Sequence, residues 1–209
     1  MPSRTHDGQP FDLPIVGTSG LPARPVERAD AARNRAKVLA AAERLFAEAG
    51  TDSVTMDEIA KAAGIGRATL YRRYPDPQSI ALALLDEHER GLQAKIILGA
   101  PPLGPGVAPA QRLAAFLSAM VDLLEGHLHL ALGAETGHAR YTTGAYAFWR
   151  SHVRLLLTEA GTSDPDTLCD MVLAPLAPEV YWFQRHTKGH SVAEIVSALH
   201  LLAARIAAT

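Results

Sequence analysis

Residues 66–72 (GRATLYR) combine side chains that suit the recognition of a nucleic acid. The Arg67 guanidinium can donate two hydrogen bonds to O6 and N7 of guanine, and the Ala and Thr that follow can contact a thymine methyl group. Tyr71 and Arg72 suit phosphate, a contact that sets register without reading bases. The core of a short helical motif requires neither Arg67 nor Tyr71. We therefore expect a DNA-binding surface formed by Thr55, Gly66, Arg67, Ala68, Thr69, Tyr71, Arg72 and Gln78.

Two short helices joined by a tight turn must position these side chains. Thr55 is a favourable N-cap, and Glu58 three residues later completes a capping box. Gly64 stands where a helix C-terminus needs a left-handed residue. A second helix is expected from Gly66 or Arg67 through Tyr71 towards residue 74, where the prolines at 75 and 77 end it. This order is typical of a helix-turn-helix.

Apolar residues at helical spacing predict the other elements, and no strand-like alternation or internal repeat is present. A Pro/Gly-rich stretch at 99–109 is the clearest internal boundary, and Pro175 and Pro178 should kink or break the helix that contains them. The predicted fold is all-α, with an arm at 1–30, a helix-turn-helix domain at 31–76 and a second helical domain at 77–209. Beside the motif, helices are expected over 31–49, 78–97, 110–125, 127–138, 144–160, 164–186 and 192–207.

Composition and net charge say more about the cellular location of the protein than about its function. The formal net charge of −2 does not by itself indicate nucleic acid, although residues 31–75 hold eight Lys or Arg against five Asp or Glu. The lone Cys169 excludes an intramolecular disulfide and suits a reducing cytoplasm. No apolar run approaches the ~18 residues of a membrane span. A cytoplasmic location without membrane partners is expected.

The arm at 1–30 and the residues just after it are rich in arginine. Arg24, Arg28, Arg33, Arg35 and Lys37 form a basic lead-in that either contacts DNA phosphate or the minor groove, or is an ordinary solvated tail. If the arm contributes, its deletion should cause a steep loss of DNA binding.

Aromatic residues are concentrated in the C-terminal half and suggest an apolar pocket between helices. Tyr141, Tyr181 and Phe183 belong to this group. The alternative to a ligand contact is, for each residue, a place in the ordinary hydrophobic core. Arg150 is a polar residue within an otherwise apolar helical segment, and it either orients a ligand or faces water. The residues expected to contact a ligand are Met120, Tyr146, Phe148, Trp149, His152, Met171 and Trp182.

Histidines suggest a metal site, but their spacing argues against one. Glu135 and His138 would share a helix face with spacing i, i+3, whereas His127 and His129 diverge by about 200° around one helix. No metal site and no cofactor are therefore expected. No set of nucleophile, base and orienting group, and no glycine-rich phosphate loop, is visible, so an enzyme is not expected either.

Residues 35–85 resemble the tetracycline-repressor (TetR) family of bacterial regulators. The resemblance covers the first helix (AKVLAAAERLFAEAG), the TMDEIA start of the second, the Ala63–Gly64 turn and the TLYRRY recognition segment. It implies a three-helix DNA-binding domain, a linking fourth helix, and a ligand-sensing helical domain that dimerises through its last two helices. One departure is Pro77, which replaces the usual phosphate-binding lysine and leaves backbone N–H groups and Gln78 at that helix end.

The function implied is a homodimeric repressor that binds a palindromic DNA operator and is released by a small, mostly apolar ligand. The alternative is a protein-interaction adaptor that keeps the helix-turn-helix for packing only. Unchanged function in cells after Arg67→Ala together with Tyr71→Ala would favour the adaptor.

Overall fold

The computed structural model describes residues 29–134, 140–141 and 143–206, and the described residues are helical with no strand. Residues 1–28 of the predicted arm, Glu135 and His138 lie outside them, whereas residues 29 and 30, predicted as part of the arm, begin the first helix. The elements in order are α1 Ala29–Ala49, η1 Thr51–Ser53, α2 Met56–Ala63, α3 Arg67–Tyr71, α4 Pro77–Leu98, α5 Pro109–Ala134, α6 Gly144–Glu159, α7 Pro165–Leu173, η3 Ala174–Leu176, α8 Pro178–Trp182, η4 Phe183–Thr187 and α9 Val192–Ile206. The all-α prediction is confirmed.

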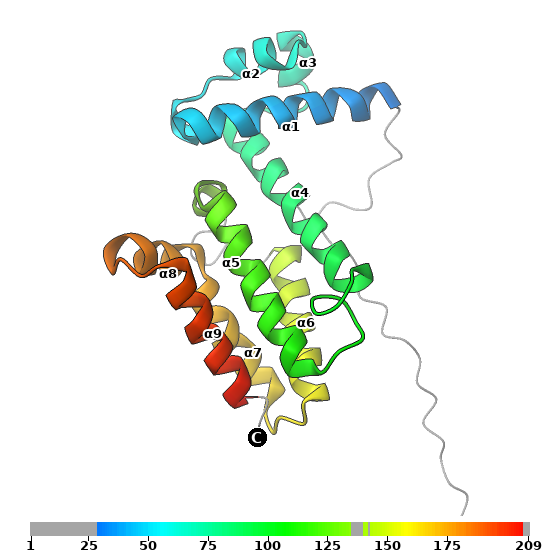
Figure 1. Cartoon of the computed structure of the whole chain (residues 1–209). Helices are drawn as coiled ribbons and strands as arrows, with labels where there is room; N and C mark the ends of the chain where they lie inside the picture. Colours follow the sequence, from blue (N-terminus) through cyan, green and yellow to red (C-terminus); the bar gives the residue numbers. More distant parts are fainter. Residues whose placement is uncertain (1–28, 135–139, 142, 207–209) are drawn as a thin grey trace, which may run out of the picture.

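Helices α1, α2 and α3 form a small unit at one end of the molecule (Figure 1). Phe46, Ile59, Leu70 and Tyr74 are buried in its core, as the apolar spacing requires. α1 crosses the start of α4, and α4 then runs along α5 into the larger helical bundle. One helix therefore belongs to both parts of the protein.

The predicted cap and turn of the helix-turn-helix are confirmed. The Thr55 hydroxyl accepts a hydrogen bond from the Glu58 backbone N–H, and the Glu58 carboxylate accepts one from the Thr55 N–H at 2.8 Å. Gly64 ends α2 in the left-handed conformation with φ 64°. α3 stops at Tyr71, earlier than the spacing predicts, and a turn leads to Tyr74. The residue before a proline is disfavoured in helical conformation, which shortens the element.

α4 begins with Pro77 at its first helical position, and Asp76 accepts a hydrogen bond from Ser79 N–H at 2.7 Å. The largely buried Arg35 of α1 forms an ion pair with Glu87 of α4. Arg35 therefore fixes α1 on α4 and is not part of a free basic lead-in.

α5 consists of two helical segments that meet at a kink, at the boundary predicted between residues 125 and 127. Its backbone leaves the helical conformation at His127 (φ −136°, ψ 22°) and then resumes. It resumes because Leu130 and Ala131 remain buried, so continued packing outweighs the local kink. α5 packs against α4, α6, α8 and α9. Contrary to the expectation from the sequence, residues Pro109–Leu132 are long and apolar enough to cross a membrane, and 39% of their apolar window is buried within the protein.

The two prolines break the C-terminal segment as predicted: α7 ends at Leu173, and Pro178 starts α8. The predicted second capping box is also present, since the Ser191 hydroxyl and the Glu194 carboxylate exchange hydrogen bonds with each other's backbone at the start of α9. α8 is tied to α5 because Glu125 accepts hydrogen bonds from Tyr181 Oη at 2.5 Å and from Arg185 Nε at 3.0 Å.

The hydrogen bonds from Tyr181 and Arg185 to Glu125 predict that the stability of the fold depends on pH. Hydrogen bonds from Arg185 and then Tyr181 lower the pKa of Glu125 to about 2. A carboxyl whose pKa is lower when folded stabilises the fold above its unfolded pKa, and this contribution disappears as the pH falls towards 2. Urea unfolding should show Glu125→Gln less stable than wild type at pH 6, with the gap narrowing at pH 3.5. Glu48→Gln, an exposed carboxylate on α1, is the control. An equal gap at both pH values would contradict the assignment.

Candidate DNA interface and interior cavity

The residues predicted to contact DNA lie on one exposed surface around α3. Thr55, Arg67, Tyr71 and Arg72 are exposed, as are the small residues Gly66, Ala68 and Thr69, whereas Leu70 between them is buried. Leu70 thus anchors α3 and its neighbours face solvent. Gln78 is half-buried at the start of α4. The arrangement can present hydrogen-bond donors to a DNA groove, as a helix-turn-helix does.

Arg67 is paired within the unit. Its guanidinium forms an ion pair with Asp57 in the first turn of α2, and the Arg67 side chain is 69% exposed. An exposed pair of this kind contributes little stability, so it can exchange for a base at small cost. Asp57, which had no place in the sequence-based prediction, therefore helps to orient the principal candidate for base recognition.

Thr55 has a more restricted role than a free phosphate ligand. Its hydroxyl already donates to the Glu58 carboxylate at 2.7 Å and accepts from the Glu58 N–H. The backbone bond and then the hydroxyl bond to Thr55 lower the pKa of Glu58, so this carboxylate stays charged at neutral pH. Thr55 is first a helix cap.

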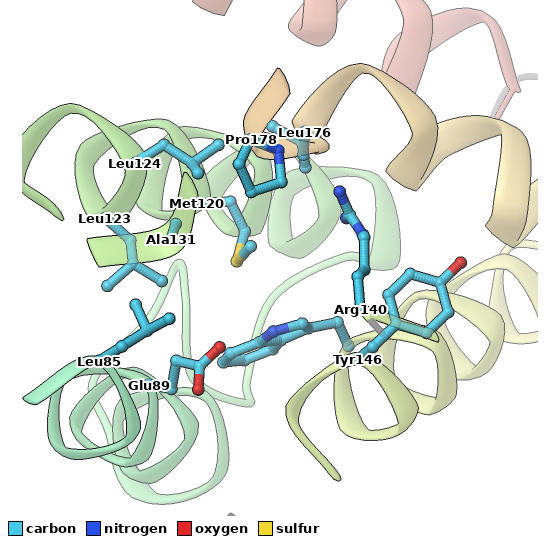
Figure 2. A pocket seen from close by; sticks show the side chains of 11 residues that line it. Leu85, Glu89, Met120, Leu123, Leu124, Ala131, Arg140, Tyr146, Leu176 and Pro178 are labelled. Atoms are coloured by element: carbon cyan, nitrogen blue, oxygen red, sulfur yellow. The ribbon is translucent and has the colours of Figure 1, made fainter. Parts of the chain in front are cut away.

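An interior cavity lies where α4, α5, α6 and η3 meet (Figure 2). Its free volume is only about 20 Å³, room for one water molecule. Most lining side chains are apolar, with Glu89 and Arg140 as the charged exceptions. The lining residues are Leu85, Glu89, Met120, Leu123, Leu124, Ala131, Arg140, Tyr146, Trp149, Leu176 and Pro178.

The predicted ligand residues divide between this cavity and other places. Met120, Tyr146 and Trp149 line it. Phe148 is buried beside Trp149, with ring centroids 5.3 Å apart, and does not line it. His152 is fully buried and lies edge-on to Phe116, at 5.2 Å between ring centroids. Burial lowers the pKa of His152 to about 3, so the ring is neutral.

Met171 and Trp182 lie elsewhere. Met171 is exposed and lines a second, open cavity of about 410 Å³ on the outer side of Arg140 and Tyr146. Trp182, at the end of α8, is exposed. Arg150 pairs with Asp170 at 2.9 Å near the surface.

Arg140 and Tyr146 separate the two cavities, since both residues line each of them. The Arg140 guanidinium lies over the Tyr146 ring, 5.3 Å from its centroid. Arg140 is buried, and within the part of the chain that is described its Nε and Nη1 have no hydrogen-bond partner. Burial, then the neighbouring Asp170 carboxylate that accepts from the hydroxyl, raise the pKa of Tyr146 to about 12.

Sequence reasoning missed Glu89 and Arg140. One signal was available for Glu89: Asp86, Glu89 and Gln93 recur on one side of α4, and all three are buried. Polar residues at helical spacing on a buried face of a long helix indicate a polar site. Arg140 stands outside any periodic segment, so its place could be found only from the tertiary structure.

Comparison with known proteins places this geometry in a family. Residues 38–84 match the model described as "Bacterial regulatory proteins, tetR family". An uncharacterized HTH-type transcriptional regulator of Mycobacterium tuberculosis (strain H37Rv) is 33% identical over 159 residues, which cover 74% of each chain. An HTH-type transcriptional regulator of Staphylococcus aureus (strain USA300) is 42% identical over 53 residues, 25% of this chain and 29% of its own.

Solved structures agree on the fold. A TetR/AcrR-family regulator from Thermobifida fusca superposes with a TM-score of 0.62 at 19% identity and covers 81% of this chain and 95% of its own. A fatty acid degradation regulator from Bacillus halodurans gives 0.61 at 18% identity, over 81% and 94%. A regulator from Saccharomonospora viridis in complex with choline gives 0.61 at 20%, over 80% and 94%. At these identities the likeness concerns the fold alone. The helix-turn-helix, the linking helix α4, the match to the family over residues 38–84 and the Mycobacterium tuberculosis relative aligned over 74% of each chain agree. The chain belongs to the tetR family of bacterial transcriptional regulators.

Proposed function

We propose that the protein is a homodimeric repressor that binds a palindromic operator in the cytoplasm and is released by a small, mostly apolar ligand. The observation that carries the proposal is the position of α4. α4 packs on α1 of the helix-turn-helix unit, and its residues Leu85 and Glu89 also line the interior cavity. A change at the cavity is thereby coupled to the DNA-binding surface. The exposed surface around α3 and the family membership do not favour the adaptor alternative.

On DNA, α3 would lie in the major groove, with Arg67 exchanging Asp57 for a guanine and Arg72 and Tyr71 holding phosphate. Two recognition helices would meet half-sites about 34 Å apart, one helical turn of DNA. Helix-end N–H groups of α4, behind Pro77, would take the place of the missing lysine.

The dimer would form through α8 and α9. These elements expose large apolar side chains, which cost free energy in water unless a partner covers them. A groove of about 630 Å³ beside α9, which Pro175 of η3 and Gln184 of η4 also line, includes Ile195, Leu199 and Leu202. The exposed apolar residues are Val180, Trp182, Phe183, Leu201 and Leu202. A second copy would bury this surface by two-fold symmetry.

The ligand would enter from the open outer cavity and displace Arg140 and Tyr146. The closed interior has room for one water molecule only, so binding must widen it and move α4. Unpartnered guanidinium nitrogens in an apolar site favour a ligand whose polar end accepts hydrogen bonds, such as a carboxylate. The ligand-bound state would change the spacing of the two recognition helices.

DNA selection tests the function itself. Selection from a random-sequence pool should yield a palindrome with half-sites one turn apart, and electrophoretic shift should show that this DNA binds in preference to random DNA of equal length. Equal competition by random DNA would contradict a sequence-specific regulator.

A matched pair of probes tests the cavity. Octanoate and octanol share an apolar chain, but only octanoate carries a charge that can pair with Arg140. Thermal unfolding should show a larger rise in Tm with octanoate, and Arg140→Gln should remove the difference. Arg154→Gln, on the outer part of α6, is the control. A preference for octanoate that survives in Arg140→Gln would contradict the role of Arg140.

A further inference from the structure

Three residues from three helices meet where the helix-turn-helix unit joins the bundle. Glu43 belongs to α1, His88 to α4 and His127 to α5, and their candidate ligand atoms all lie within 4.8 Å of one another. His88 Nε2 lies 3.1 Å from Glu43 Oε1. The two imidazole rings stack with centroids 3.6 Å apart and an interplanar angle of 16°. Two imidazole nitrogens and one carboxylate therefore lie close together, and because the rings are stacked, at least one ring must rotate before both nitrogen lone pairs can point at one ion.

Ordinary packing does not account for this cluster. His88 Nε2 is buried, and within the described part of the chain it makes no hydrogen bond, although Glu43 Oε1 lies 3.1 Å away. A buried polar atom without a partner costs free energy, roughly 1–3 kcal/mol. The α5 backbone leaves helical geometry at His127, the residue that places its ring against His88. An unsatisfied nitrogen and an interrupted helix coincide at one point.

The residue types suit a metal ion. An imidazole nitrogen binds a metal ion through its lone pair. Glu43 adds one negative charge and is exposed, so an ion can reach the cluster from solvent.

We propose that Glu43, His88 and His127 form a binding site for a divalent transition-metal ion such as Zn²⁺, with water completing the coordination. Two imidazoles and one carboxylate are a ligand set that zinc accepts with an open fourth position. Metal bonds of about 2.0–2.2 Å require tetrahedral ligand atoms to lie roughly 3.3–3.5 Å apart. The candidate ligand atoms lie within 4.8 Å of one another, so side-chain rotation must bring them to that spacing.

A metal ion here would join α1, α4 and α5 and so hold the DNA-binding unit in one orientation on the bundle (Figure 1). His88 is adjacent in sequence to Glu89, which lines the interior cavity. The ion would be a second input to α4, separate from the proposed organic ligand. This role goes beyond the proposed function and does not depend on operator binding.

Metal titration of the untagged full-length chain, without DNA, tests the site. Zn²⁺ added to chelator-treated protein should bind one ion per chain by calorimetry, and Co²⁺ should produce the visible absorption of a tetrahedral site. Glu43→Gln, His88→Gln and His127→Gln should each weaken binding by at least about tenfold. Glu43 is exposed, so its variant tests coordination with little risk to folding, and circular dichroism checks all three.

His129→Gln is the matched control, because His129 is exposed on the same helix two residues from His127. It should bind zinc as wild type does. Wild-type protein that takes up no stoichiometric zinc, or folded Glu43→Gln and His127→Gln variants that retain wild-type affinity, would overturn the proposal. Failure of operator binding would leave these measurements unchanged, so the two proposals fail separately.

Discussion

Replacing Arg67 by alanine is expected to weaken operator binding by about 10- to 100-fold, the fold-change that corresponds to losing one bidentate arginine–guanine pair. The side chain is exposed on α3, and its ion pair is with the half-exposed Asp57, so the variant should fold normally. Its effect should concentrate on one base pair of each half-site. Binding to random DNA should fall much less.

Arg72→Ala is the matched comparison for that experiment. Arg72 is also exposed beside α3, but we assign it to phosphate. Loss of Arg72 should weaken binding to operator DNA and binding to random DNA by similar factors. It should also reduce the slope of log affinity against log salt concentration by about one. Titration of selected and mismatched operators at several salt concentrations separates the two patterns. An Arg67→Ala variant that behaves as Arg72→Ala does would show that Arg67 reads no base.

The second large effect is expected at the proposed dimer face. Leu202→Glu should convert the dimer to monomer and thereby abolish tight operator binding. Leu202 is 37% exposed on α9 beside Leu201, which is 60% exposed. A carboxylate in an apolar interface must be stripped of water without a partner, a cost of several kcal/mol. Loss of one half-site from each complex then removes the advantage of two linked contacts.

Leu98→Glu is the control for that substitution. Leu98 ends α4 and is 82% exposed, so it offers the same chemical change away from α8 and α9. Sedimentation velocity should show Leu98→Glu as a dimer and Leu202→Glu as a folded monomer. A Leu202→Glu variant that remains dimeric would move the interface away from α9.

Local sequence determined the helices and their ends. The capping boxes at Thr55 and Ser191, the left-handed Gly64 and the prolines at 175 and 178 act within a few residues, so their effects were predictable without the fold. The exposed residues of α3 follow from the same reasoning, because burying Leu70 turns its neighbours outward. The family resemblance rests on this local pattern.

The tertiary structure decided which polar groups meet. Arg67 with Asp57 and Arg140 with Tyr146 involve residues from different elements, and helical periodicity cannot say which faces come together. The sequence likewise pointed to Met171 and Trp182 as ligand contacts, yet both are exposed, because the packing of their helices decides which face is buried.

His127 most clearly shows the difference between what the sequence determined and what the tertiary structure decided. By spacing alone it could be compared only with its neighbours on one helix, and those point away from it. The kink in α5 and the crossing of α1 over α4 bring it instead to His88 and Glu43. Residues 39 and 84 positions apart in the chain meet there because side-chain packing, a long-range property, sets how helices cross.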